Sequence, residues 1–481
     1  MGNRITGEEK SIKLNFIMNA ILTMSSFIVP LITFPYISRV LFPEGVGKYN
    51  FAVSLVAYFN MFAQLGIPTY GIKVCAKVRD NREALSRTVR ELLFLNMILA
   101  TVSYLVLIAA VVLVPRLRNE KALYLITGTT ILFTSFGMEW LYQGLEEYSY
   151  ITIRSVIFKG IAVIAMFLLV YEKTDYVKYA AIQAFATGAS YILNFINSKK
   201  YIDLRVQGGI DIRHHLRPIL VFFALVCTTT IYTNLDNVML GFMKDDIEVG
   251  LYSTAVKIKT ILVSLITSLG AVLLPRAAYY VEQGEMERFR EIVSKALRFV
   301  LLSALPVTIY FILYAEEGIL FIAGSAFEGS VRPMQIIMPT VLFIGITNIL
   351  GLEIMVPTGR EKLVLYSTIF GAATDIILNL LLIPKYGASG AAIGTLAAEG
   401  VVLAVQIRFL KGEVYEFFRD ISLVRFFLTA LSSGIAALFI KRLHASIFVI
   451  LLLSAVLYFG LYIIMNFELV VSFVKNQKLQ K

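Results

Sequence analysis

Apolar runs of about 20 residues, separated by short polar segments, recur along the whole chain. A helix rises about 1.5 Å per residue and a bilayer core is about 30 Å thick, so each run is long enough to cross a membrane as a helix. The pattern therefore predicts an all-α, polytopic membrane protein with about fourteen transmembrane helices. The predicted spans are 14–38, 46–70, 91–114, 122–143, 150–170, 177–197, 218–242, 249–274, 297–315, 334–356, 363–383, 388–409, 423–440 and 446–467.

Composition supports this class. Hydrophobic residues make up 58% of the 481 positions and charged residues 16%, which excludes an ordinary soluble globular protein. The formal net charge of +11 would suggest nucleic acid as a partner of a soluble protein. In a membrane protein the placement of the basic residues matters more, and we expect no nucleic-acid partner.

The basic residues indicate an orientation. If the N-terminus is cytoplasmic, the segments on that side hold 28 Lys and Arg residues and the opposite loops hold 12. Because Lys and Arg accumulate in cytoplasmic loops, both termini are predicted to be cytoplasmic. Four of the 44 basic residues remain inside predicted spans: Arg154, Lys159, Lys257 and Lys259.

A basic residue within a span needs a partner. A helix that starts near Tyr150 places Lys159 about 13 Å deep, where a lone cation costs about 2.5–3.5 kcal/mol on insertion scales. At 100° per residue, Arg154 and Lys159 lie about 140° apart around the helix, and Lys257 and Lys259 about 200° apart. These residues either border a polar cavity or pair with acids in the membrane, and Arg154 could instead extend back to the interface. Which of Arg154 and Lys159 faces a cavity is left open.

The chain also repeats itself. Segments 45–59 and 77–94 have counterparts about 200 residues later, at 248–262 and 282–299. Each repeat holds six helices, an even number, so the two repeats should have the same orientation in the membrane. The predicted architecture is two pseudo-symmetric six-helix lobes followed by two further helices. The predicted limits are 1–199 for the N-terminal lobe, 200–217 for a cytoplasmic linker, 218–411 for the C-terminal lobe, and 412–481 for the last two helices and a cytoplasmic tail.

Four acidic residues also lie in apolar runs: Asp236, Asp375, Glu353 and Glu399. Buried carboxylates can carry a coupling proton or bind Na⁺. Asp236 is the first candidate, because Asn234 and Asn237 flank it, and Asp375 is the second. The alternative is that the acids pair with the buried cations or cap helices.

Motifs of enzymatic chemistry are missing. The chain has no Walker A pattern, no nucleophile elbow and no pair of carboxylates in an external loop, so we expect no enzyme activity and no cofactor. His214 and His215 lie in a basic linker with no third ligand at metal-site spacing. The sequence therefore predicts a solvated pair and no metal site.

Three stretches resemble one family. TFPYISRVLFPEGVGKYNFA at 33–52 is similar to the first hairpin of Wzx-type flippases for O-antigen and capsule repeat units, 136–159 to their fourth-to-fifth helix connection, and 232–258 to their seventh-to-eighth. This family belongs to the superfamily of MATE drug exporters and the lipid II flippase MurJ. The resemblance implies a protein of the bacterial inner membrane that moves an oligosaccharide on undecaprenyl diphosphate to the outer leaflet by alternating access. Membrane lipids and other polysaccharide-assembly proteins are the further partners it implies.

The resemblance suggests roles for the buried cations. Lys159, Arg154 and Lys257 would meet the diphosphate, with Lys259 as a weaker candidate, and Arg39 would edge a lateral opening for the lipid tail. Pro30 and Pro35 should kink or unwind the helix before Arg39. A MATE-like exporter of small cationic drugs, a membrane polymerase or ligase of lipid-linked sugars, and a structural scaffold are the alternatives. The buried cations argue against the exporter, and the short external loops argue against the polymerase. The identity of the sugar and of the coupling ion does not follow from the sequence.

Overall fold

A computed structural model describes residues 12–205, 209–419 and 421–469. These residues form helices joined by short turns and contain no strand, as the sequence predicts. The chain divides into two compact units, Met1–Phe242 and Met243–Lys481. The predicted cytoplasmic ends, 1–11 and 470–481, lie outside the described residues.

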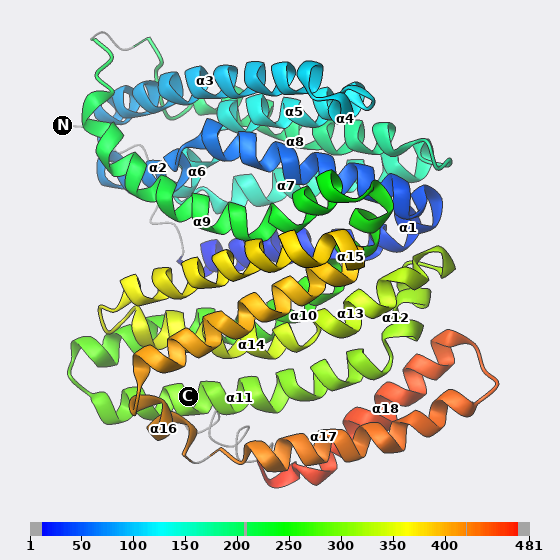
Figure 1. The fold of residues 1–481 in the computed structure, drawn as a ribbon. Coiled ribbons are helices and arrows are strands. Elements are labelled where there is room, and N and C mark those ends of the chain that lie inside the picture. The colour runs from blue at the N-terminus through cyan, green and yellow to red at the C-terminus, as the bar shows by residue number, and fades with distance from the viewer. Residues whose placement is uncertain (1–11, 206–208, 420, 470–481) are drawn as a thin grey trace. The chain divides into compact units, whose positions relative to one another are not determined.

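The first unit is a bundle of long helices with short helices at their ends (Figure 1). Its helices are α1 (Ile12–Gln64), α2 (Ile67–Val78), α3 (Arg82–Leu113), α4 (Pro115–Arg118), α5 (Lys121–Phe136), α6 (Glu139–Gly144), α7 (Tyr148–Leu169), α8 (Tyr176–Ser198) and α9 (Arg213–Met243). Helix α7 packs against both α1 and α8. The bonds of Tyr150 to Leu193 and of Arg154 to Ser190 show that α7 and α8 run in opposite directions.

Helix α1 breaks between the predicted spans 14–38 and 46–70, but the expectation that Pro30 and Pro35 unwind the helix is wrong. The backbone keeps helical dihedral angles at Pro30 and Pro35, so neither proline unwinds the helix. The departure lies at Phe42, with φ 59° and ψ 175°, directly before Pro43. A residue before proline is disfavoured in the helical region because the proline ring meets its backbone. The break therefore divides α1 into two limbs on either side of Phe42.

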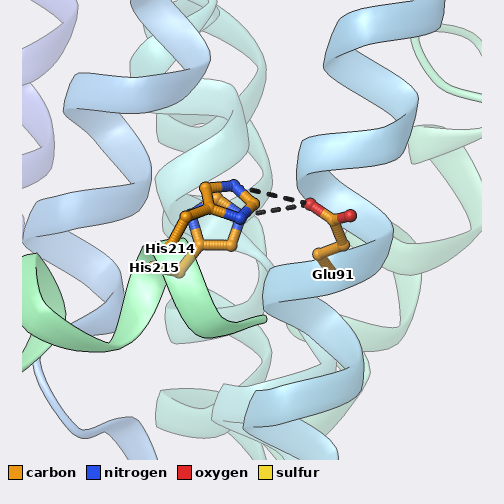
Figure 2. Close-up of side chains that lie close together, drawn as sticks. All are labelled: Glu91, His214 and His215. Atoms are coloured by element: carbon orange, nitrogen blue, oxygen red, sulfur yellow. Dashed lines mark hydrogen bonds and ion pairs between the residues drawn. The ribbon is translucent and has the colours of Figure 1, made fainter. Parts of the chain in front are cut away.

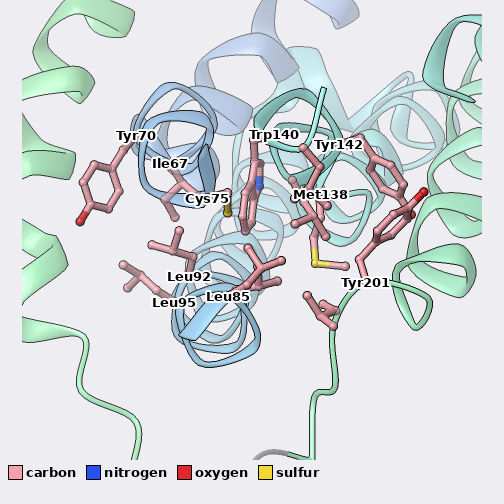
Figure 3. Close-up of a cluster of buried hydrophobic side chains, with 14 of the residues drawn as sticks. Ile67, Tyr70, Cys75, Leu85, Leu92, Leu95, Met138, Trp140, Tyr142 and Tyr201 are labelled. Carbon is pink, nitrogen blue, oxygen red and sulfur yellow. The ribbon is translucent and has the colours of Figure 1, made fainter. Parts of the chain in front are cut away.

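A cluster of buried hydrophobic side chains lies in the first unit (Figure 3). Trp140 of α6 lies against Gly71 of α2, where a Cβ atom would come within 2.6 Å of the indole ring. Tyr142 and Tyr201 pack edge to face in the same cluster, with ring centroids 5.9 Å apart. Large aromatic side chains of this kind contribute much of the packing energy of a core. The cluster fixes α2, α3 and α6 to the segment that follows α8.

The described part of the linker before α9 packs on α3. The backbone N–H of Asp203 donates to Ser86 at 2.9 Å, and that of Asp211 donates to Glu91 at 3.2 Å. His215 is buried, with 2% of its surface exposed. The expectation of a solvated histidine pair is thus wrong for His215, because the fold places α3 over it. The predicted lobe limits stay a prediction.

The second unit is also a helical bundle (Figure 1). It contains α10 (Asp246–Glu282), α11 (Met286–Leu313), α12 (Ala315–Ile322), η1 (Ser325–Ser330), α13 (Val331–Ile337), α14 (Pro339–Asn348), η2 (Ile349–Met355), α15 (Glu361–Leu410), α16 (Glu413–Phe418), α17 (Leu423–Leu438), η3 (Phe439–Arg442) and α18 (Ile447–Met465). Helix α15 is a hairpin with its turn at Gly387, where φ is 53°. The close approach of Gly371 to Ala398 places its two limbs side by side.

The predicted count of fourteen spans is not confirmed. The described residues contain nine helices long and apolar enough to cross a membrane, or ten if the bent pair Ser325–Ile337 and Pro339–Met355 forms one span. Two pairs of predicted spans each fall within one helical stretch, Ile17–Val78 and Glu361–Leu410, because the connection within each pair contains a single non-helical residue, Phe42 or Gly387. Helix α5 has only 16 residues and is not among the nine.

Large apolar side chains lie exposed along the outside of the helices. Leu113, Leu168, Val456 and Ile464 each expose more than 60% of their surface. A soluble protein rarely tolerates so much exposed apolar surface, whereas lipid tails cover it without cost. The protein is therefore a multi-pass membrane protein.

Candidate functional site

A polar cavity lies inside the first unit, among α1, α6, α7 and α8. Its volume is about 230 Å³. It is lined by Val29, Thr33, Glu139, Arg154, Ser155, Phe158, Lys159, Ala162, Val163, Met166, Gln183, Ala186, Thr187, Ser190 and Tyr191. Arg154 and Lys159, the two basic residues within the predicted span 150–170, thus line one cavity.

Arg154 is buried in the wall of this cavity, with 5% of its side chain exposed. Its Nη2 atom donates to Glu139 at 3.3 Å and its Nη1 atom to the carbonyl oxygen of Ser190 at 3.2 Å. The guanidinium also lies over the rings of Tyr150 and Tyr191, 5.9 and 5.6 Å from their centroids. Its Nε atom has no hydrogen-bond partner among the described residues. Arg154 therefore pairs with an acid, which is one of the two arrangements that the sequence left open.

Lys159 is half-buried, and its hydrogen-bond partners are neutral hydroxyl groups. Its ammonium donates to Ser25 at 2.8 Å and to Ser26 at 2.9 Å, both on α1. No carboxylate forms an ion pair with Lys159 within the ranges that the structure describes. Hydroxyl groups satisfy the donors of an ammonium without neutralising its charge. Lys159 is thus the cation of this cavity that no carboxylate contacts directly among the described residues, although Glu139 lines the same cavity.

The geometry explains how two divergent side chains share one cavity. Arg154 and Lys159 lie about 140° apart around α7, so each borders a different side of it. Helix α8 supplies the wall beside Arg154, whereas α1 supplies the wall beside Lys159. Long basic side chains then extend toward the space between these helices. The cavity combines two cations with one carboxylate, so it favours an anionic group of small size.

Sequence reasoning missed several polar residues of this region. Gln183 and Thr187 on α8 line the cavity and also a second one of about 260 Å³, which Asn60 and Thr130 border as well. Amides and hydroxyls in apolar runs are the only sequence signal for such residues, and they occur too often to identify a site. Their assembly depends on how α1, α5 and α8 pack.

Arg39 lies exposed on α1, and its Nη1 atom donates to the carbonyl oxygen of Pro35 at 2.6 Å. Its predicted part in a lateral opening stays a prediction.

Lys257 and Lys259 lie half-buried on α10 in the second unit. Each unit is described by itself, and a shared site with Arg154 and Lys159 stays a prediction.

All four predicted coupling acids are buried: Asp236, Glu353, Asp375 and Glu399. Glu353 differs from the others in its backbone, because it lies on the π-helical turn η2. Its Oε1 atom has no hydrogen-bond partner among the described residues. π-helical turns are rare and frequently mark functional sites. The side-chain amides of Asn234 and Asn237, which flank Asp236, donate to the carbonyl oxygen of Thr230 and to the hydroxyl of Ser54.

Lipid-exposed helices around an internal polar cavity define a multi-pass membrane transporter. The chain belongs to the family of polysaccharide biosynthesis proteins, whose model matches residues 12–281. A second model, that of the MatE family, matches residues 222–381.

A relative of known sequence and two solved structures are similar to this chain. The chain is 22% identical over 403 residues to an Escherichia coli K12 protein named "Putative O-antigen transporter", which covers 83% of this chain and 97% of that protein. Among solved structures, the lipid II flippase MurJ in an inward closed conformation matches with a TM-score of 0.76 and 16% identity, over 94% of this chain and all of that one. An inward-facing MATE transporter matches with a TM-score of 0.67 and 13% identity, over 85% of this chain and all of that one. The fold is therefore that of MurJ and the MATE transporters, as the resemblance implied.

Proposed function

We propose that this protein is a flippase that moves oligosaccharides linked to undecaprenyl diphosphate from the cytoplasmic to the outer leaflet of the bacterial inner membrane. Membership in the polysaccharide biosynthesis family, likeness to an O-antigen transporter and the MurJ fold support this function. The protein acts as a transporter and not as a catalyst. Both its termini face the cytoplasm, in agreement with the excess of basic residues in that set of loops.

The observation that carries this proposal is the cationic cavity beside α7. A charge buried in a membrane span is a functional candidate by default. Lys159 is held by two serine hydroxyls and by no carboxylate in direct contact among the described residues, and Arg154 lines the same cavity. A diphosphate offers the acceptor oxygens that both groups need. A cavity of about 230 Å³ has room for such a group but not for a whole lipid-linked oligosaccharide, so sugar and lipid would lie outside it.

The MatE match makes a drug exporter the second candidate. A cavity lined by Arg154 and Lys159 repels cationic drugs, because one carboxylate cannot neutralise both. We therefore expect cells that lack the protein to keep their resistance to cationic dyes. Unchanged dye efflux in those cells would support the flippase.

Deletion of the gene followed by analysis of membrane lipids tests the flippase. We expect the surface polysaccharide to be lost and one diphosphate-linked oligosaccharide to accumulate on the cytoplasmic leaflet. Mass spectrometry of the extracted lipids identifies its sugars, and a periplasmic enzyme that cleaves accessible sugars reports the leaflet. Accumulation on the outer leaflet would contradict the proposal, since the block would then follow the flipping step.

We also propose that transport is coupled to H⁺ or Na⁺ through one of the buried acids. We propose Glu353 as the coupling residue, on the strength of its burial and its π-helical turn. Vesicles with an imposed proton or sodium gradient would identify the ion.

A further inference from the structure

Two adjacent histidines meet a glutamate at the start of α9 (Figure 2). The Nε2 atom of His215 lies 3.1 Å from Oε2 of Glu91, and the Nε2 atom of His214 lies 4.0 Å from the same oxygen. Each of the three residues offers a ligand atom, and these atoms all lie within 4.8 Å of one another. All three residues belong to the first unit. The site is separate from the cavity that contains Arg154 and Lys159.

The spacing suits a tetrahedral metal ion. Ligands at about 2.0–2.1 Å from a zinc ion, at tetrahedral angles, lie roughly 3.3 Å from one another. The two distances to Glu91 are 3.1 and 4.0 Å and therefore bracket this value. Only His214 needs to move closer. Its side chain is 57% exposed, so it can do so without disturbing the core.

Two further contacts orient the buried ligands. The Nδ1 atom of His215 is hydrogen-bonded to the hydroxyl of Tyr70 at 2.8 Å, which leaves Nε2 directed at Glu91. The Oε1 atom of Glu91 accepts the backbone N–H of Asp211 at 3.2 Å, which leaves Oε2 for the histidines. Metal-binding histidines and carboxylates are typically held in this way by partners on their other atom. Both buried ligands are thus oriented before any ion binds.

An ion can reach this group from solvent. Glu91, Asp211 and His214 line a surface cavity of about 610 Å³. The cavity leaves room for water as a fourth ligand beside the two imidazoles and the carboxylate.

We propose that Glu91, His214 and His215 bind one divalent transition-metal ion of the zinc class. Two imidazole nitrogens and one carboxylate oxygen suit Zn²⁺ and Co²⁺ better than Mg²⁺ or Ca²⁺, which prefer oxygen ligands alone. The ion joins α3 to the first turn of α9 and so fastens the start of α9 to α3. This site is independent of the substrate and of the direction of transport.

Cobalt binding to the full-length protein tests the site. The protein is purified without a histidine tag, stripped with a chelator and titrated with Co²⁺, whose visible absorption reports tetrahedral coordination. We expect one ion per chain in the wild type. His214→Ala, which alters the exposed ligand, should weaken binding at least tenfold, and Glu91→Gln should do the same with little change in shape.

The third histidine of the chain provides a matched control. His444 is exposed in the second unit, so His444→Ala should bind Co²⁺ as the wild type does. Hydrogen exchange supplies an independent readout, in which Zn²⁺ should slow the exchange of residues 209–215 in the wild type but not in His214→Ala. Two outcomes would overturn the site: no stoichiometric binding by the wild type, or equal binding by wild type and His214→Ala. Either would leave Glu91 and His215 as a hydrogen-bonded core pair.

Discussion

Lys159 is a charged residue in a membrane-spanning helix, where its position suggests a role in substrate binding. The cation lies within a membrane-spanning helix, and its partners are two serine hydroxyls. Arg154, one turn and a half away, has a carboxylate partner in Glu139. The two cations of one helix are thus held differently. Arg154 contributes to the structure of the cavity wall, whereas Lys159 keeps a charge available for a ligand.

We predict that Lys159→Met abolishes surface polysaccharide while the protein still reaches the membrane. A hydrogen bond to a charged group contributes about 1.5–3 kcal/mol, so the affinity for the diphosphate should fall roughly tenfold to a hundredfold. Quantification of polymer and of membrane-bound protein in complemented deletion cells measures both effects.

Lys159→Arg should retain function, since it preserves the charge. Lys362→Met removes an exposed lysine at the start of α15 and should change nothing. Normal polymer in cells that carry Lys159→Met would exclude this residue from the substrate site.

We predict that Glu353→Gln uncouples transport from the driving ion. The substitution keeps the shape of the buried side chain but removes the proton or Na⁺ that it would carry. Flipping in vesicles should lose its response to an imposed pH or sodium gradient, with a rate at least tenfold lower than that of the wild type. Glu361→Gln, at an exposed position on α15, is the control. If Glu353→Gln responds to both gradients as the wild type does, another acid or no acid couples transport.

At the scale of single elements, α15 contains a tight turn at Gly387 within an otherwise continuous helical stretch. The turn at Gly387 joins two limbs, and the carboxylate of Glu248 accepts the backbone N–H of Ala388 at 2.6 Å beside it. Only a glycine takes up a φ of 53° readily, since a Cβ atom there meets the following carbonyl group. The sequence predicts two spans here, 363–383 and 388–409, and this turn lies between them.

We predict that Gly387→Ala destabilises the protein. Left-handed backbone costs about 1–2 kcal/mol for a residue with a Cβ atom, and that atom would lie 2.3 Å from Oε2 of Glu248. The midpoint of thermal unfolding in detergent should fall by a few degrees. Gly400→Ala on the same helix is the control, because the nearest atom to its new Cβ is 3.8 Å away. Equal midpoints for the two variants would show that the turn tolerates a side chain.

The ends of this hairpin are joined by an ion pair outside the membrane-spanning segments. Arg360 donates to Glu413 through two bonds of 2.8 and 2.9 Å. The hydrogen bond from Arg360 lowers the pKa of the Glu413 carboxyl below its ordinary value of 4.5. The pair is partly exposed, with 27% and 49% of the two side chains accessible, so its contribution should not exceed about 1 kcal/mol.

We predict that Glu413→Gln lowers the unfolding midpoint at pH 7 but not in strong acid. A lowered pKa in the folded state means that the pair stabilises above pH 4.5 and that this stability is lost as the pH falls through the lowered pKa. The midpoints of wild type and variant should therefore converge below pH 4.5, and salt should reduce the difference at pH 7. A difference that does not change with pH would point to lost packing and not to lost charge.

At the scale of the whole molecule, the loops determine orientation. We predict that a cysteine at Asn119 reacts with a membrane-impermeant maleimide in intact cells, and that one at Gln283 reacts only after the inner membrane is opened. Both positions are exposed. The background for both is a chain in which Cys75 and Cys227 are replaced by alanine, because those two are the free thiols. The opposite pattern would reverse the proposed topology.

The sequence by itself determined the class of this protein. Periodic apolar runs require a helical membrane protein, since a bilayer leaves few other ways to satisfy the backbone. The positions of the basic residues also identified four that lie within predicted spans and not in loops: Arg154, Lys159, Lys257 and Lys259. These four stand out because a membrane span provides no water to solvate a charge. These conclusions depend only on the composition of short segments, which can be determined without knowing how the helices pack.

Only the tertiary structure decided which groups meet. It brought Arg154 to Glu139 and Lys159 to Ser25, and it kept α1 helical at Pro30 and Pro35. It also set Glu91 beside His214 and His215, a ligand more than 120 residues away that no spacing rule reveals. Contacts of this kind depend on how helices pack against one another, which is a property of the folded chain and not of any single segment.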